Sequence, residues 1–139
     1  MTARLVGRCR FERVLRSERE RSTLSAFNTH VMANICETWL SISRDDAFTT
    51  DEVEALRKDI EEDVTYDGST SFERADDCLI ECMTGTRWAI PTKELQAVAA
   101  KYRVNIRGIG REDGCGFVQV VCVNDRGEVV QDASIDYAL

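Results

Sequence analysis

The pattern of apolar and polar positions is clearest between residues 77 and 109, where it changes from strand to helix and back. The apolar run at 78–83 predicts a short strand, which the polar stretch at 84–87 is expected to end. Pro91 suits the first turn of a helix, because its missing N–H would have no intrahelical partner there. The apolar residues of this helix are spaced along one face: Ile90, Leu95, Val98, Ala99 and Tyr102.

Three strands are expected after this helix. The extended pattern resumes at 104–109, and the nearly continuous apolar run at 117–123 predicts a strand in the interior of a sheet. The sequence Asn-Asp-Arg-Gly at 124–127 predicts a hairpin turn in which Gly127 takes a positive φ. Residues 128–137 then return as a charged outer strand, which resists pairing with other chains.

The amino-terminal half contains one expected strand and two expected helices. Alternation at 4–12 predicts a half-buried strand with arginines on its outer face. Apolar residues at helical spacing over 17–40, without Pro or Gly, predict a long helix that packs on a sheet. Thr49 and Glu52 stand in the capping-box relation at the start of a second helix. The apolar seam of that helix is Val53, Leu56, Ile60 and Val64.

These elements predict a single α+β domain over 1–139, with an antiparallel sheet of about five strands covered on one face by two to three helices. Residues 1–75 supply a strand and a helical region, and residues 76–139 supply a β-α-β-β-β unit. Hydrophobic residues make up 43% of the chain, which is typical of a globular domain. No apolar window approaches about 18 residues, and the amino terminus has no uninterrupted apolar stretch. We therefore expect no membrane span, no signal peptide and a cytoplasmic location.

The net charge of −7 is distributed unevenly along the chain. Residues 1–21 carry seven Arg against three Glu, a local net charge of +4. Residues 45–81 carry fourteen Asp and Glu against three basic residues, a local net charge of −11. This acidic block is expected to repel nucleic acid and to attract basic surfaces.

The six cysteines predict packing rather than chemistry. Most lie in strand-like runs among apolar neighbours, where a reduced cysteine behaves as a small hydrophobic residue. No cofactor and no metal is expected, because a zinc site needs a close cysteine pair and further ligands. A thiol-based metal or redox protein using Cys78, Cys82 and Cys115 remains an alternative.

No catalytic signature is evident in the sequence. His30 is the single histidine, and it falls near the apolar stripe of a predicted helix. Gly108 and Gly110 resemble part of a phosphate loop, but the pattern joins strand to strand, so turn glycines are expected there. Paired carboxylates are plentiful, and none is singled out as an acid–base pair. The sequence therefore favours a protein that is not an enzyme.

One stretch resembles a known family. A Trp-x-x-Pro corner at Trp88 and Pro91, a short amphipathic helix, a strand, an acidic glycine-containing turn at 112–114 and another strand resemble the YubB-type domain of plasmid and phage proteins. The resemblance covers roughly residues 78–124, and Thr92 stands where that family usually has a second proline. It implies a ferredoxin-like sheet without an iron–sulfur cluster and an origin in a mobile element. It transfers no catalytic residue.

Charge and resemblance together predict a small acidic binding protein that blocks the nucleic-acid site of a host defence complex, in the manner of DNA-mimicking anti-CRISPR proteins. The expected partner is a basic surface of a host nucleic-acid-binding complex. The expected contact residues are Asp59, Glu61, Glu62, Asp63, Asp67, Asp76 and Asp77. An alternative is a nucleic-acid-associated accessory domain that uses the arginine-rich amino terminus, although the overall acidity disfavours direct nucleic-acid binding. A homodimer is also left open.

Overall fold

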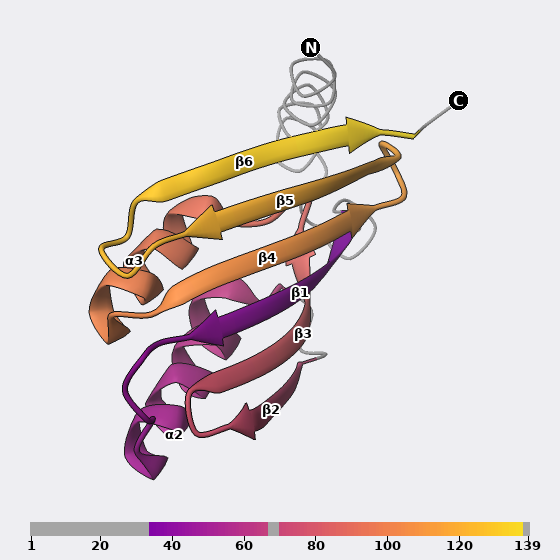
Figure 1. The fold of residues 1–139 in the computed structure, drawn as a ribbon. Coiled ribbons are helices and arrows are strands. Elements are labelled where there is room, and N and C mark those ends of the chain that lie inside the picture. The colour runs from indigo at the N-terminus through magenta and orange to yellow at the C-terminus, as the bar shows by residue number, and fades with distance from the viewer. Residues whose placement is uncertain (1–33, 67–69, 138–139) are drawn as a thin grey trace.

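The structure is a computed structural model that describes residues 34–66 and 70–137. In these residues six antiparallel strands form one sheet in the order β2-β3-β1-β4-β5-β6, and two helices lie side by side on one of its faces (Figure 1). The elements are β1 (Ile35–Ser43), α2 (Thr50–Asp59), the π-helical turn η2 (Ile60–Val64), β2 (Ser71–Asp76), β3 (Leu79–Arg87), α3 (Thr92–Tyr102), β4 (Asn105–Glu112), β5 (Phe117–Val123) and β6 (Val129–Asp136). The predicted α+β class with an antiparallel sheet is confirmed.

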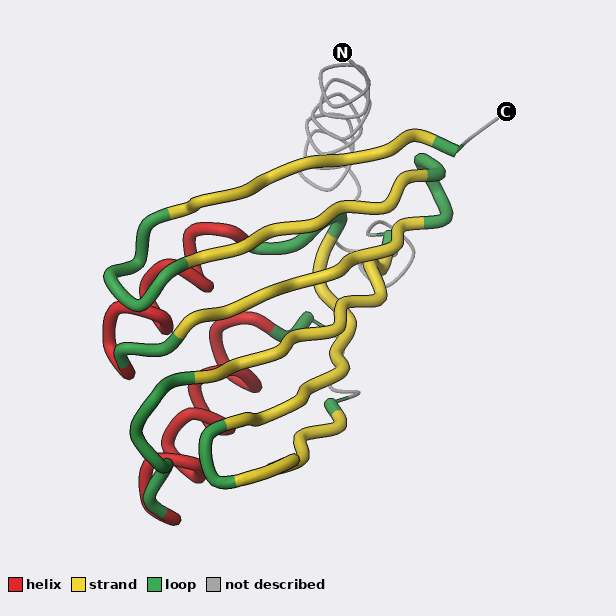
Figure 2. The backbone as a smooth tube through the Cα atoms, in the orientation of Figure 1, coloured by secondary structure: helices red, strands yellow, loops and turns green. Residues whose placement is uncertain are grey.

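The strand order results from two split β-α-β units. Strand β1 lies between β3 and β4 and is antiparallel to both, so β3 and β4 run parallel and α3 crosses over β1. In the same way α2 connects β1 to β2 across β3. Strands β5 and β6 extend the sheet as a hairpin beside β4. Figure 2 shows both helices behind the strands, and none of the residues that the structure describes forms a helix on the other face of the sheet.

The long helix expected over 17–40 is wrong for its last residues. These form β1, where Cys36, Leu40 and Ile42 are buried and alternate with more exposed positions. Apolar residues in this segment fit a period of two as well as a helical period, and pairing with β3 and β4 on both sides decides in favour of the strand. The rest of that helix and the strand expected at 4–12 lie outside the described residues.

The sheet has one strand more than the expected five in the part of the chain that the structure describes. Four of the expected strands correspond to β3 to β6, and β1 and β2 are the two unexpected ones; in β2 only Phe72 packs against the core while the other side chains are exposed. Strand β3 also continues through 84–87 instead of ending there. Its threonines are accommodated by side-chain hydrogen bonds, such as the 2.9 Å contact between the hydroxyls of Thr38 and Thr86.

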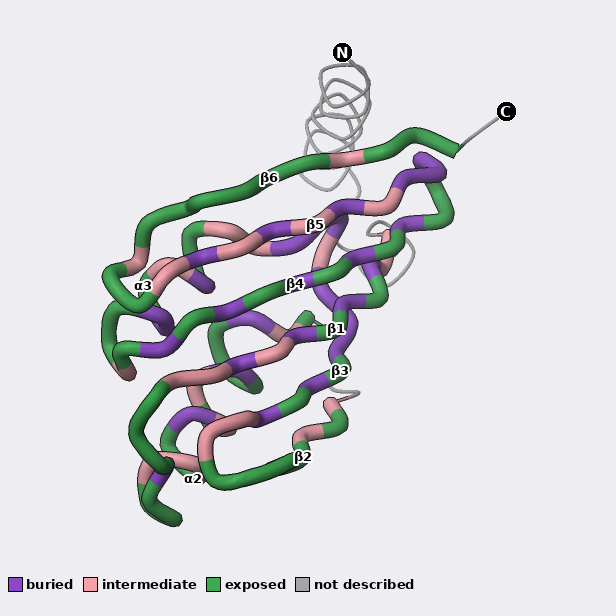
Figure 3. The backbone as a smooth tube through the Cα atoms, in the orientation of Figure 1, coloured by how far each residue is buried: buried purple, intermediate pink, exposed green. Residues whose placement is uncertain are grey.

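The capping box predicted at the start of α2 is confirmed. The Thr49 hydroxyl accepts a hydrogen bond from the Glu52 N–H at 3.1 Å, and the Thr49 N–H donates to the Glu52 carboxylate at 3.0 Å. Leu56, Ile60 and Val64 are buried against the sheet, so the predicted seam runs through α2 into η2. On α3 the predicted stripe is also confirmed, with Leu95, Val98 and Ala99 buried. Figure 3 shows the buried positions alternating along the central strands.

The prediction that Gly108 and Gly110 end a strand is wrong. Both lie inside β4 on its buried face, beneath Ile90. A Cβ atom at Gly110 would lie 2.7 Å from the Cys36 sulfur and 2.8 Å from Cγ1 of Ile90. Glycine is therefore required here by the close approach of the Ile90 side chain to the strand. The hairpin turn at 124–127 is confirmed, with Gly127 at φ +79.

Replacing Gly110 with alanine is expected to destabilise the fold by about 1–3 kcal/mol, because the added methyl group overpacks the core between β4 and Ile90. Chemical denaturation of wild type and variant measures the difference. Gly108→Ala is the matched control on the same strand. Its nearest neighbour would be Cδ2 of Leu40 at 3.2 Å, a flexible side-chain end, so it should cost clearly less. Equal losses for the two variants would contradict this account of β4.

Candidate functional site

Three consecutive acidic residues lie in η2, directly after α2. Glu61, Glu62 and Asp63 occupy η2, where all three are exposed while the flanking Ile60 and Val64 are buried. We call these three residues the η2 acidic cluster. The wide π-helical turn displays three consecutive carboxylates because only its first and last residues contact the core.

The predicted contact residue Asp59 lies beside this cluster, but its carboxylate makes hydrogen bonds within the fold. Its carboxylate accepts hydrogen bonds from the Lys101 ammonium at 2.7 Å and from the Tyr102 hydroxyl at 2.6 Å. Lys101, followed by Tyr102, lowers the pKa of Asp59 below its usual value. These contacts join α2 to α3 across 42 residues of sequence.

The other predicted contact residues are placed in two separate regions. In the η2 acidic cluster, Glu61 pairs with Arg57 at 3.0 Å and Glu62 lies 4.0 Å from Lys58. Asp76 and Asp77 instead lie at the β2–β3 turn, where Asp76 accepts a hydrogen bond from the Cys78 N–H at 2.7 Å. Asp77 lies 3.5 Å from the Arg74 guanidinium. Asp67 lies outside the described residues.

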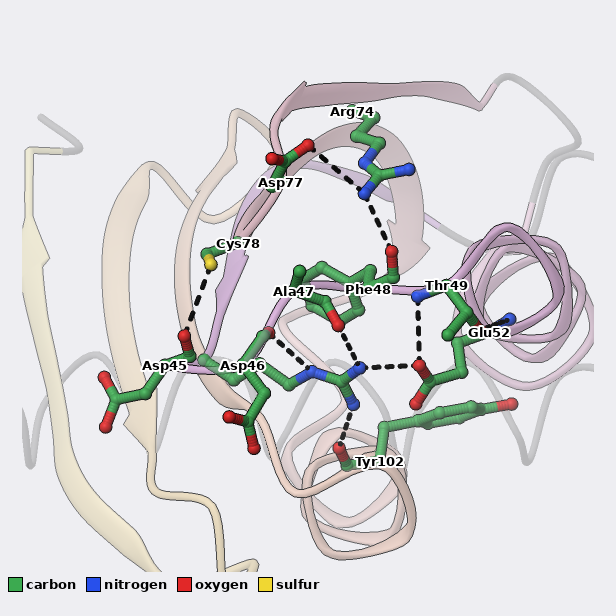
Figure 4. A network of polar contacts seen from close by, with 11 residues as sticks. Asp45, Asp46, Ala47, Phe48, Thr49, Glu52, Arg74, Asp77, Cys78 and Tyr102 are labelled. Atoms are coloured by element: carbon green, nitrogen blue, oxygen red, sulfur yellow. Dashed lines mark hydrogen bonds and ion pairs between the residues drawn. The ribbon is translucent and has the colours of Figure 1, made fainter.

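The turn between β1 and α2 is organised by Arg44, a residue that sequence reasoning did not single out. Its guanidinium donates to the carbonyl oxygens of Asp46, Ala47 and Tyr102 and, at 2.6 Å, to the Glu52 carboxylate (Figure 4). The guanidinium also lies over the Phe48 ring, 4.3 Å from its centroid. The network attaches the start of α2 to the end of α3 and thereby supports the helical layer.

The Arg44–Glu52 pair predicts a loss of stability in acid. The hydrogen bond from Arg44, followed by that from the Thr49 N–H, lowers the pKa of Glu52 from 4.5 to about 2. Because the folded pKa lies below the unfolded value, this stabilisation is complete above pH 4.5 and is lost as the pH falls toward 2. Glu52→Gln should remove that part of the pH dependence.

Urea denaturation at several pH values between 4.5 and 2 measures this effect as the slope of unfolding free energy against pH. The slope should be shallower in Glu52→Gln than in wild type. Glu62→Gln is the control, because its carboxylate lies 4.0 Å from Lys58 on an exposed helical surface. Wild type and Glu52→Gln with equal slopes would contradict the assignment.

The three thiols of the metal or redox alternative lie in different surroundings. Cys82 is buried within β3, and burial raises its pKa to about 11, which disfavours the thiolate needed for metal binding or redox chemistry. Cys78 donates to the Asp45 carbonyl, and Cys115 is buried at the β4–β5 turn. Within residues 34–66 and 70–137, no group of three or more His, Cys, Asp or Glu side chains could hold a metal ion.

The sheet face opposite the helices carries a row of residues that crosses every strand and is apolar on all of them except β2, where the residue is a serine; this is the apolar row. The strand pairings place these residues side by side in the order Ser71, Met83, Trp39, Ile109, Val120 and Ala133. Met83 is 47% exposed, Trp39 41% and Ile109 36%. We call this row with its neighbouring charged residues the open face. Three large apolar side chains in one exposed row are unusual for a surface that contacts only water.

Charges on the open face are divided by β1. The row next to the apolar one places Glu81, Ser41 and Arg107 side by side, with Glu73 beyond Glu81. Acidic residues thus lie on the β2–β3 side and Arg107 on the β4 side. A shallow depression of about 360 Å³ follows the acidic side, lined by Trp39, Ser41, Ser71, Glu73, Glu81 and Met83 among others.

The described part of the chain contains no helix that is long and apolar enough to cross a membrane. Comparison with protein-family models, with curated proteins and with solved structures gives no significant match for this chain.

Proposed function

We propose that this protein is a non-enzymatic binding protein, encoded by a phage or plasmid, that inhibits a host defence nucleoprotein such as a CRISPR effector. It presents carboxylates to the basic nucleic-acid site of that complex and blocks the site in the cytoplasm. The observation that carries the proposal is the η2 acidic cluster, in which three consecutive carboxylates are exposed between the buried residues Ile60 and Val64.

The contacts that hold η2 in place favour a role in binding. Burial of Ile60 and Val64, together with the hydrogen bonds of Asp59 to α3, holds η2 against the sheet. A charged surface on a fixed element needs little ordering when it binds, so less of its interaction energy is lost. The cluster is continued by a shallow depression of about 450 Å³ toward α3, which Glu94 and Lys93 also line.

The predicted contact residues Asp76 and Asp77, and two further acidic residues that were not predicted as contacts, lie away from η2. Asp76 and Asp77 lie at the β2–β3 turn, where Asp76 accepts from the Cys78 N–H and Asp77 lies near Arg74. Glu73 and Glu81 lie on the open face, across the sheet from the helices. Since one flat basic surface cannot contact all these positions together, we assign the primary contact to Glu61, Glu62 and Asp63.

The strand order supports the ferredoxin-like interpretation of the fold. The observations in its favour are the order β2-β3-β1-β4 and the two split β-α-β units, to which the β5–β6 hairpin is added. Trp88 in this resemblance is buried at the end of β3 with φ 68, consistent with a structural corner.

Binding to purified CRISPR effectors, measured by calorimetry at low and at physiological salt, tests the proposal. We expect association that weakens as salt increases, because the contact is mainly electrostatic. The effector loaded with its target nucleic acid should bind much more weakly than the effector without target. Equal binding to both forms would contradict a blocked nucleic-acid site.

Direct nucleic-acid binding is the second candidate. Trp39 is exposed at the centre of the open face, with Arg107 and Arg111 on the neighbouring strand, and single-stranded bases stack on such aromatic side chains. Glu37 and Glu81 on the same face oppose phosphate binding. A salt-dependent gel shift with single-stranded RNA and DNA separates the two candidates, because a nucleic-acid mimic should bind neither.

A further inference from the structure

We propose that the open face binds a second copy of this chain, forming a twofold-symmetric dimer in which the two sheets pack face to face. The first observation is the apolar row, in which Met83, Trp39 and Ile109 lie side by side on three adjacent central strands. The helices of residues 34–66 and 70–137 both lie on the opposite face of the sheet (Figure 2). Two sheets that stack with their strands nearly aligned bury such rows against each other.

Charge complementarity selects the second copy as the occupant. In the row beside the apolar one, Glu81 and Arg107 lie at equal distances on either side of β1, with Ser41 between them. Within the described residues neither of these two charged side chains has a hydrogen-bond or ion-pair partner. Each is therefore available to a charge of opposite sign on another molecule.

A twofold axis along β1 brings these charges together. Rotation about that axis places β3 of one copy over β4 of the other without shifting the rows. Glu81 of each copy then faces Arg107 of its partner, which gives two equivalent ion pairs, as an isologous interface requires. Met83 faces Ile109 in the same way, and Trp39 faces its own symmetry mate. An axis perpendicular to the strands would instead place Arg107 over Arg111, so charge repulsion disfavours it.

The size of the face suits a dimer of moderate affinity. About this axis five strands of each copy overlap, β2 to β5, and at about 4.8 Å per strand and about 25 Å in length they present roughly 600 Å² per copy. Two such faces approach the lower end of the range for stable interfaces, about 1,200 Å² in total. The one unfavourable contact is Glu37 on β1, which would approach its symmetry mate, with Arg111 on the adjacent strand to compensate.

The dimer does not depend on the function proposed above. The η2 acidic cluster lies in the helical layer, on the opposite side of the sheet from the interface. Each dimer would therefore carry two such clusters on its outer faces and could engage two basic sites at once. Sedimentation equilibrium needs no binding partner, so a failure of the dimer and a failure of the proposed function are separate results.

Sedimentation equilibrium of the full chain is expected to show a reversible dimer. Glu81→Arg and Arg107→Glu should each weaken dimerisation by about tenfold, because each variant places two pairs of like charges in contact. An equimolar mixture of the two variants should recover the wild-type affinity, since both contacts of the mixed dimer would again join one arginine to one glutamate. Trp39→Ala should weaken the dimer by roughly thirtyfold or more if this side chain is the central anchor.

Glu94→Arg and Arg126→Glu are the matched charge controls, since Glu94 lies on α3 and Arg126 lies in the β5–β6 hairpin turn. Both should dimerise like wild type. A full-length chain that remains monomeric would overturn the proposal, as would single variants that the mixture does not rescue. If that monomer bound single-stranded RNA and lost binding in Trp39→Ala, the open face would be assigned to nucleic acid instead.

Discussion

Replacing Glu61, Glu62 and Asp63 together with lysine is expected to weaken binding to the basic partner by roughly 100-fold. Three reversed charges at a contact of this kind each cost about 1 kcal/mol, and the long-range repulsion also slows association. The effect should be largest at low salt, because exposed charges are screened beyond about 10 Å at ordinary ionic strength. Titration calorimetry or surface-based binding kinetics with the purified effector measures it.

The control for this triple variant changes the same number of charges elsewhere. Asp46→Lys/Asp125→Lys/Glu128→Lys alters exposed residues near the Arg44 corner and the β5–β6 turn, away from η2. It should bind nearly as well as wild type, with only the small general effect of reduced net charge. If both triple variants lose affinity equally, total charge governs binding and the η2 acidic cluster has no special role.

Truncating Leu56 to alanine is expected to lower the free energy of unfolding by about 2–5 kcal/mol. Leu56 is 0% exposed, and it is the one buried residue within α2. It packs in the main core together with Ile60, Ile80 and Leu95, so its removal leaves a cavity between the helical layer and the sheet. Urea denaturation, followed by circular dichroism, gives the loss directly.

Val53→Ala on the same helix is the control for the loss of Leu56. Val53 is only partly buried at the edge of the core, so its truncation should cost clearly less. Neither variant changes a charge. A loss of partner binding in Leu56→Ala would therefore come from the weakened packing beneath η2 and not from lost electrostatic attraction. A Leu56→Ala protein as stable as Val53→Ala would show that α2 is not held in the way described.

Local signals in the sequence predict several elements well. The capping box at Thr49 and the apolar seams of α2 and α3 are present in the structure as expected. The hairpin turn ending at Gly127 is also as expected. Each of these depends on residues within a few positions of one another, so no tertiary contact is needed to recognise them.

The elements that were missed depend on contacts between distant residues. The sequence predicts helix at β1 because its apolar residues fit a helical period as well as a period of two. Only the pairing with β3 and β4 decides in favour of the strand. Strand β2 has a single core-facing residue, Phe72, so no alternating apolar pattern marks it. Gly110 is a glycine within a strand, and not a turn glycine, because the side chain of Ile90, twenty positions away, approaches its backbone.

The candidate site was predicted as a charge block but not in its arrangement. Sequence alone does not show that Asp59 is held by Lys101 and Tyr102, which are 42 and 43 residues away. It also does not separate the η2 acidic cluster from Glu73 and Glu81 across the sheet. The open face was not foreseen for the same reason, since its apolar row draws one residue from each of six strands.

Competition with nucleic acid is the most direct test of the central claim that this protein occupies a basic nucleic-acid site. Labelled target DNA or RNA is bound to a purified CRISPR effector and titrated with the protein or with the η2 triple variant. We expect the wild-type protein to displace the labelled strand competitively and the triple variant to do so roughly 100-fold less well. Binding of the protein to the effector without displacement of the nucleic acid would contradict it.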